Sequence, residues 1–545
     1  MRVVQIGWIA MNTHRLAVLM AGLFALAPFA AWPHDDDKAA DPYSKLGKVQ
    51  FANSCSRAVQ PKLLRGIAML HSFWYSAAET TFEEVAREDP RCAIAAWGYA
   101  SILMSNPLAG GGALPLDAER AQLAIDKGRS MGAKTARERD YLEAVAAYYE
   151  NFAGRSERER QIARAKAYEA LAAKYPKDDE AQIFYALYLA GTQLQSDQSY
   201  AAYRKAAAIL EQQFKRHPRH PGVAHYLIHS YDAPPIARQG VPAARRYAGI
   251  APDAPHALHM PSHIFTRVGA WADSVATNRR SADVAQTGRE PDEALHAMDY
   301  MTYAYLQLGR DGEARKVIAE SAQVSGVNAG RFVGPYALAA MPARYAMERG
   351  AWREAAQLQP VASKFPFAEA ITYSARAIGA ARSGDPAAAQ GDLEQLEKRV
   401  EALKAAKNAY WMTEVEVMRL SAAAWTAQAQ GKGEEALAMM RQAADAEDKN
   451  EKHIVTPGRV LPARELLGDL LMALKRPAEA LREYEQSQQR EPDRLRGLYG
   501  TAMAARAAGD EAKAARILKH LAKQVRGADG ERPELQEMKQ VLSAK

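Results

Sequence analysis

Three histidines lie close together in the stretch "APHALHMPSHIFTRVGAW", which covers residues 254–271. They are His256, His259 and His263, and spacings of three and four residues place side chains on one face of a helix. Neutral imidazole is the commonest metal ligand in proteins, so several rings on one face indicate a metal or polar-ligand site. Pro261 removes a backbone hydrogen bond, so we expect a kink or a late helix start there.

Further histidines at helical spacing lie on both sides of this stretch, and eight of the thirteen in the chain fall within 217–296. In "HYLIHSYD" the first histidine is followed four residues later by another and then, three later, by an aspartate. In "LHAMDY" a histidine and an aspartate are three apart. Carboxylates beside imidazoles complete a metal shell or orient the rings. The predicted metal site consists of His225, His229, His256, His259, His263, His296, Asp232 and Asp299.

These ligands favour a transition metal ion, but they do not distinguish zinc, copper and iron. Zinc proteases share the spacing of His225 and His229, but their general-base glutamate is replaced here by Tyr226, which disfavours a protease. The competing interpretation is an anion site, in which histidines act together with nearby arginines. Those arginines are Arg245, Arg246 and Arg267.

The chain contains an internal comparison for this stretch. Residues 337–352, "ALAAMPARYAMERGAW", repeat the Met-Pro and Gly-Ala-Trp landmarks of residues 256–271, at a distance of 81 positions. The three histidines are replaced there by Ala337, Ala340 and Arg344. The same helical frame therefore does not require histidine for packing.

The remaining histidines are interpreted differently. We expect packing or surface roles for His217, His220, His453 and His520. His71 is expected to pack against the aromatic cluster of Phe73, Trp74 and Tyr75. Asn278 is a polar residue at a helix position that usually carries an aromatic, so it needs a partner, for which a histidine is suitable.

The elements that position these residues are helices, because apolar residues follow a helical period almost throughout and strand signals are absent. Residues 463–492 show a repeat pattern, with Gly468, Ala480, Tyr484 and Pro492 at its landmarks. The chain resembles the tetratricopeptide repeat (TPR) family over most of residues 51–545. Segments such as "HYLIHSYDAP" also resemble uncharacterised secreted bacterial TPR proteins, a resemblance that implies no activity.

The resemblance implies an all-α, TPR-like α-solenoid, a right-handed superhelix of about twelve helix pairs. Turns between the first and second helix of a pair are expected at Gly269, Gly309, Gly350, Gly384 and Gly431. In this family, the first-helix positions that the histidines occupy line the concave groove. We divide the repeats into residues 51–200, a histidine-rich middle at 201–330, irregular pairs at 331–455 and C-terminal repeats at 456–545.

The N-terminus predicts export. Residues 1–31 are typical of a signal peptide, with an uncharged apolar run from Leu16 to Ala31, and an uncleaved anchor is the alternative. Residues 32–50 are expected to be a linker. Cys55 and Cys92 precede two consecutive first helices, whose starts are neighbours in such a stack, so we expect a disulfide. A periplasmic or secreted location follows, with no membrane span in the mature chain.

The net charge of the chain excludes few classes of function. The net charge of +7 is spread along the chain without a basic block, which disfavours nucleic acid as a partner. The leading hypothesis is an exported repeat scaffold with a protein or peptide partner and a histidine-rich concave site that binds a transition metal. A metalloenzyme that uses this site is one alternative, and a TPR adaptor without metal is the other. The sequence favours a binding protein over an enzyme.

Overall fold

The computed structural model describes residues 45–543, and within this range all regular structure is helical. The predicted signal peptide and most of the predicted linker lie outside the described residues. No helix of the described part of the chain is both long and apolar enough to cross a membrane.

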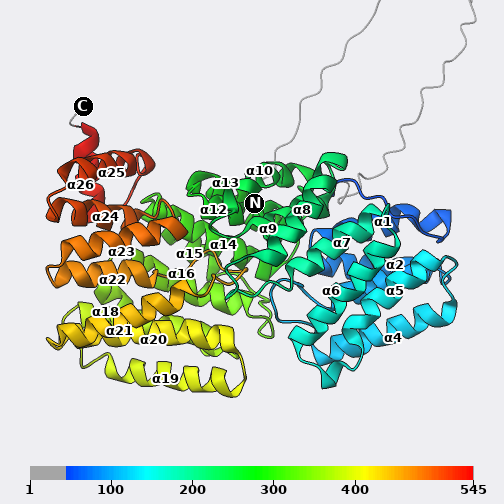
Figure 1. The fold of residues 1–545 in the computed structure, drawn as a ribbon, viewed down its shortest axis with the longest axis horizontal. Helices are drawn as coiled ribbons and strands as arrows, with labels where there is room; N and C mark the ends of the chain where they lie inside the picture. The colour runs from blue at the N-terminus through cyan, green and yellow to red at the C-terminus, as the bar shows by residue number, and fades with distance from the viewer. Residues whose placement is uncertain (1–44, 544–545) are drawn as a thin grey trace, which may run out of the picture. The chain divides into compact units, whose positions relative to one another are not determined.

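The helices follow one another, most of them with short connections (Figure 1). The first part of the chain contains η1 (Arg57–Val59), α1 (Gln60–His71), α2 (Tyr75–Glu88), α3 (Ile94–Leu103), α4 (Pro115–Met131), α5 (Ala136–Tyr149), η2 (Phe152–Gly154), α6 (Glu157–Lys174), α7 (Asp179–Ala190) and α8 (Ala201–Arg216). The middle contains α9 (Pro221–Tyr231), η3 (Ala237–Gly240), α10 (Val241–Ile250), α11 (Pro255–His259), α12 (Pro261–Arg267), α13 (Trp271–Thr287), α14 (Pro291–Gln307) and α15 (Asp311–Ser321). The last part contains α16 (Val333–Glu348), α17 (Trp352–Ala356), α18 (Pro366–Arg382), α19 (Gln390–Ala405), α20 (Ala409–Ala429), α21 (Gly433–Asp448), α22 (Ala463–Ala473), α23 (Pro477–Arg490), α24 (Leu495–Ala507), α25 (Glu511–Gln524) and α26 (Pro533–Ser543).

These helices pack as successive pairs. With α11 and α12 taken as one broken helix, α1–α25 form twelve pairs, and the two helices of each pair contact each other. The first helices of consecutive pairs also touch, as in the series α14, α16, α18, α20, α22 and α24. The structure therefore confirms the predicted all-α, TPR-like solenoid, in which each pair buries its apolar face against its neighbours.

Glycines occupy the turns and the close contacts between helices of the solenoid. The predicted turn glycines, such as Gly269 and Gly350, adopt positive φ angles of 72° and 64°, which few other residues tolerate. Gly468 lies directly under Tyr484, where a Cβ atom would approach the ring to 2.6 Å. The landmarks that carry the TPR resemblance thus have the packing roles expected of them.

Pro261 divides one first helix into α11 and α12. In the internal comparison the equivalent Pro342 lies inside the continuous helix α16. The same Met-Pro pair is therefore compatible with a continuous or a broken helix, and the break occurs in the copy that carries histidines.

The predicted disulfide is present. Cys55 lies shortly before α1 and Cys92 shortly before α3, and their Cα atoms are 4.7 Å apart. This distance is within the normal range for a disulfide. The bond closes a sequence separation of 37 residues between the first two pairs.

One long connection is buried. Residues 449–462 join α21 to α22 without regular structure, and we call them the strap. Lys452 of the strap contacts Asp232 after α9, and the ring of His453 contacts the carbonyl of Ala109. Tyr300 on α14 donates a hydrogen bond to the carbonyl of Thr456. The strap therefore crosses helices that are far apart in sequence.

Candidate metal centre

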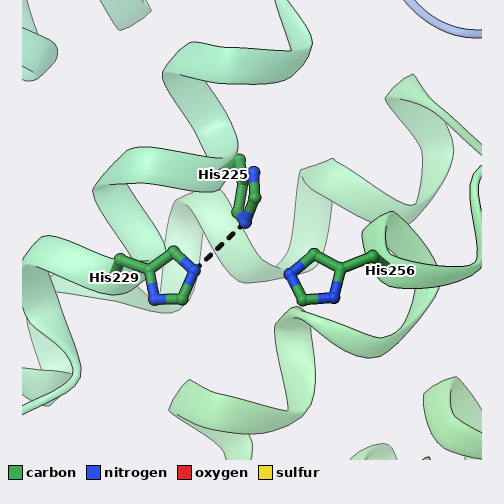
Figure 2. Close-up of side chains that lie close together, drawn as sticks. All are labelled: His225, His229 and His256. Carbon is green, nitrogen blue, oxygen red and sulfur yellow. Dashed lines mark hydrogen bonds between the residues drawn. The ribbon is translucent and has the colours of Figure 1, made fainter. Parts of the chain in front are cut away.

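The six predicted histidines gather in one buried cluster on α9, α11, α12 and α14, and each is at most 6 % exposed. They form two groups of three. In each group, ligand nitrogens of the three rings all lie within 4.8 Å of one another. The first triad is His225, His229 and His256, whose rings converge in Figure 2. The second triad is His259, His263 and His296.

The tautomer of His259 is fixed by its surroundings. Nδ2 of Asn278 donates a hydrogen bond to the carbonyl of Ser274 at 2.7 Å, so the amide cannot be reversed without placing two oxygens together. Oδ1 of Asn278 therefore faces Nδ1 of His259, at 2.7 Å, and must accept a hydrogen bond from the Nδ1–H group. In the neutral ring this leaves a lone pair on Nε2 of His259. The predicted need of Asn278 for a histidine partner is confirmed.

The tautomer of His263 is fixed in the same way by a carboxylate. Nδ1 of His263 lies 2.9 Å from Oδ2 of Asp232 and donates to it, which leaves a lone pair on Nε2. This Nε2 lies 3.0 Å from Nε2 of His259. Burial lowers the pKa of His263 to about 4 and the pKa of His259 well below its usual value. At neutral pH two lone pairs therefore face each other, an arrangement that a cation between them would stabilise.

The first triad has a comparable arrangement. Nδ1 of His225 donates to the carbonyl of His71 at 2.7 Å, and Nδ1 of His256 donates to Glu293 at 3.1 Å. Nε2 of His256 is buried and has no hydrogen-bond partner among the described residues. Nε2 of His229 lies 3.1 Å from Nε2 of His225, shown as the dashed line in Figure 2. One imidazole proton can bridge this pair, but it leaves His256 unsatisfied.

The two triads adjoin each other. The ring centroids of His229 and His263 are 5.6 Å apart, and those of His256 and His259 are 5.8 Å apart. Within the second triad the rings of His259 and His296 are 4.1 Å apart. All six rings thus belong to a single cluster, although they come from three consecutive helix pairs.

Asp232 supports this cluster from behind. Oδ1 accepts from Arg267 at 2.8 Å, and Oδ2 accepts from both His263 and Lys452, the latter at 3.1 Å. These bonds occupy the carboxylate, and the cations hold its pKa far below the usual range, although burial alone would raise it. Asp232 therefore orients a ligand ring and is not itself free to bind an ion.

Asp299 has a different environment from the other predicted ligands. It belongs to neither triad. Its ion-pair partner among the described residues is Arg344, whose Nη2 lies 3.8 Å from Oδ1 of Asp299. Burial raises the pKa of Asp299 to about 6. The spacing of three residues between His296 and Asp299 does not bring them to one ion, because Asp299 lies toward the next pair and faces α16.

The three arginines on which the anion-site interpretation depends are not available to a ligand at the triads. Arg245 and Arg246 are exposed, and Arg246 covers the ring of Phe214. Arg267 is buried and paired with Asp232. The positive charge near the triads is therefore already neutralised, and it is not directed toward a ligand.

The histidines are buried rather than exposed on an open groove. The strap covers the second triad, because Tyr300 contacts both Thr456 of the strap and the ring of His263. The ring of Phe73 covers the first triad, with its centroid 4.4 Å from that of His225. The TPR pattern places the first helices correctly, but it contains no signal for a long connection that folds across them.

A third group of possible ligands is satisfied without an ion. His71 and His220 each lie 2.9 Å from one oxygen of Glu180, and the second nitrogen of His71 accepts from Tyr226. The second nitrogen of His220 accepts from the backbone of Val223. His71 also stacks on Phe184 rather than on the expected aromatic cluster. His220 is buried and packs against His71, so it has the packing role expected of it.

The other histidines have the packing or surface roles expected of them. His453 stacks on Trp411 with ring centroids 5.1 Å apart. His217 pairs with Asp179, and His520, which is exposed, pairs with Asp493. None of these three belongs to a triad within the described residues.

Comparison with known proteins gives no closer assignment. No protein-family model and no curated protein sequence matches the chain. The APC/C hetero-tetramer Cut9–Hcn1 is similar over 89% of this chain and 96% of its own, at 12% identity and a TM-score of 0.29. The human IFIT1 dimer with m7Gppp-AAAA is similar over 79% of this chain and 90% of its own, at 11% identity and a TM-score of 0.37. At these scores the likenesses carry no functional argument, and the fold rests on the contacts between this chain's own helices.

Proposed function

We propose that this protein is an exported helical-repeat scaffold that holds a transition metal ion in its buried histidine cluster. The observation that carries the proposal is the opposition of Nε2 atoms in His259 and His263, 3.0 Å apart. Two nitrogens that bind one ion at about 2.0–2.1 Å lie roughly 3.3 Å apart, so the spacing is close to that of a bound pair. Hydrogen bonds to Asn278 and Asp232 hold the ring protons on the two Nδ1 atoms, so no proton bridges the two Nε2 atoms.

The chemistry of the donors favours a late first-row ion. Both triads offer only imidazole nitrogens, which suit zinc, copper, iron and nickel, whereas magnesium, calcium and manganese prefer oxygen. Asp232 and Glu293 orient one ring in each triad, the arrangement that raises the basicity of a metal-ligating histidine.

Burial favours a closed binding centre over a catalytic one. A metalloenzyme needs a coordination position that substrate can reach, and here the strap and Phe73 lie over the rings. The adaptor alternative is weakened in this region, since the strap occupies helix surface that a peptide partner would contact. Protein binding elsewhere on the scaffold is compatible with the metal centre.

Export is the second part of the proposal. It is supported by the signal-like residues 1–31 and by the disulfide between Cys55 and Cys92, because disulfides persist in oxidising compartments. Secretion can be followed by fractionating cells that express the full chain. Recovery of the uncleaved chain in the cytoplasm with both thiols reduced would contradict this part.

Elemental analysis tests the metal centre. Protein purified both aerobically and anaerobically is expected to carry stoichiometric zinc, copper or iron, and His263→Gln is expected to reduce that content. His453→Gln is the matched control, because His453 is also buried but belongs to neither triad. Absence of bound metal from the wild-type protein in both preparations, and after incubation with each ion, would refute the proposal.

A further inference from the structure

We propose that the cluster holds two metal ions, one in each histidine triad. This inference rests on the proposed function and extends it from one ion to an adjoining pair. The second triad alone motivates a single ion, so the case for two depends on how the first triad is built.

The two triads share one construction. Each takes two histidines four residues apart from one first helix, and a third histidine from the start of the next first helix. In the first triad these are His225 and His229 of α9 with His256 of α11. The second triad repeats the plan one pair further along, with His259, His263 and His296. The solenoid therefore builds the same site twice in succession.

The supporting contacts repeat as well. In each triad one ring donates its Nδ1 proton to a carboxylate, which is Glu293 for His256 and Asp232 for His263. Another ring donates to a neutral oxygen, which is the carbonyl of His71 for His225 and Oδ1 of Asn278 for His259. Two rings of each triad therefore present an Nε2 lone pair. The acceptor that holds the proton on Nδ1, and so fixes the tautomer, comes from a different part of the chain for each ring.

The first triad is left incomplete by hydrogen bonding alone. A proton on His229 can bridge to His225 across 3.1 Å, but the buried Nε2 of His256 has no partner among the described residues. Figure 2 shows a nitrogen of all three rings directed toward one point. An ion at that point would bind Nε2 of His256 and both rings of α9.

The dimensions fit one ion in each triad. Three atoms within 4.8 Å of one another enclose a point no more than about 2.8 Å from each, so contraction by about 0.7 Å reaches the zinc–nitrogen distance. The triads share no histidine, and binding of one ion leaves the other triad intact. Because rings of the two triads are separated by only 5.6 Å between centroids, the ions would be neighbours.

The satisfied group of His71, Glu180 and His220 provides the contrast. It also brings ligand atoms within 4.8 Å, yet every ring nitrogen in it has a hydrogen-bond partner of the opposite kind. Proximity of ligands alone therefore does not define an ion site in this protein. The triads differ because lone pairs are left facing each other or facing no donor.

Zinc titration of the full chain tests the pair. Metal-stripped protein is titrated with Zn²⁺ against a chromophoric chelator, and bound zinc is counted after desalting. We expect two ions in the wild type, one in His225→Gln, one in His263→Gln and none in the double variant. His453→Gln is the control and should retain two. Circular dichroism verifies that each variant is helical, and glutamine keeps a polar side chain of similar reach.

The outcomes separate this inference from the proposed function. One ion in the wild type that His225→Gln retains and His263→Gln loses would overturn the pair and leave the single-ion function standing. One ion lost in both single variants would mean a shared site and would also overturn the pair. If a variant does not fold, the wild-type count decides between one and two. No zinc in the wild type would remove both proposals.

Discussion

Nζ of Lys452 lies 3.1 Å from Oδ2 of Asp232, although the two residues are 220 positions apart in the chain. Both are buried, and the same carboxylate oxygen accepts from the ring of His263. This contact ties the strap to the second triad. Lys452 of the strap therefore supports the second triad through Asp232, and the strap is more than a linker between two repeats.

Loss of this ion pair should destabilise the protein. Lys452→Met leaves the charge of Asp232 with one fewer partner in a buried place, although Arg267 still contacts it. Removing one member of a buried pair costs about 3–5 kcal/mol, and we expect about 3 kcal/mol because Arg267 remains. Urea unfolding measures the change in free energy of unfolding. Lys449→Met, an exposed strap position, is the control and should change stability by less than about 0.5 kcal/mol. If Lys452→Met lowers the free energy of unfolding no more than Lys449→Met does, the contact between Lys452 and Asp232 contributes little to stability.

Asn278 should control the affinity of the second triad without binding the ion. Asn278→Leu removes the acceptor that holds the proton on Nδ1 of His259, so the ring can turn or change tautomer. Loss of such a partner typically lowers metal affinity by about 10–100-fold. Competition with a chelator measures the dissociation constant.

The matched control for Asn278 is Thr277→Val, which affects the next residue of α13. The hydroxyl of Thr277 bonds to the carbonyl of Leu258 and not to a histidine ring. We expect wild-type metal affinity in this variant. An Asn278→Leu protein that binds metal as tightly as Thr277→Val would contradict the assigned tautomer.

Much of the fold follows from the sequence, because repeat landmarks encode local packing. Gly269 and Gly350 mark turns that need positive φ, and Gly468 makes room for Tyr484. Histidines four residues apart on a helix must share a face, so both triads contain a pair that the spacing predicts. These features depend on neighbours within one or two helix pairs.

The remaining parts of the site depend on contacts between distant segments. Glu293 and Lys452 lie in ordinary-looking charged stretches, and only their neighbours in the fold reveal that they orient ligands or support Asp232. The strap has no helical period, and its burial rests on partners such as Ala109 and Asp232, more than 200 positions away. Asp299 has the right spacing from His296, but the packing of α14 directs it to Arg344.

Removal of the disulfide should destabilise the N-terminal pairs. Cys55 and Cys92 close a separation of 37 residues, for which the chain-entropy estimate is roughly 3–4 kcal/mol. We expect the Cys55→Ser, Cys92→Ser double variant to melt at a lower temperature than the wild type. Metal content should be unchanged, since neither cysteine belongs to a histidine triad. Reductant should lower the melting temperature of the wild type and leave the variant unaffected. A wild-type protein insensitive to reductant would contradict a stabilising bond.

Acid should destabilise the metal-free protein in a window set by the buried histidines. Burial lowers the pKa of His263 to about 4 and that of His453 to about 3, against about 6.5 in an unfolded chain. Between pH 6.5 and 4 the unfolded state therefore binds more protons, so stability present above pH 6.5 is lost as the pH falls. Each such histidine contributes on the order of 1.4 kcal/mol per pH unit. Unfolding in urea at pH 7, 5.5 and 4.5 measures the slope, and His453→Gln should reduce it by one histidine's share. A free energy of unfolding that stays constant from pH 7 to 4.5 would show that these rings titrate in the folded protein as they do in the unfolded chain, which would contradict the lowered pKa values.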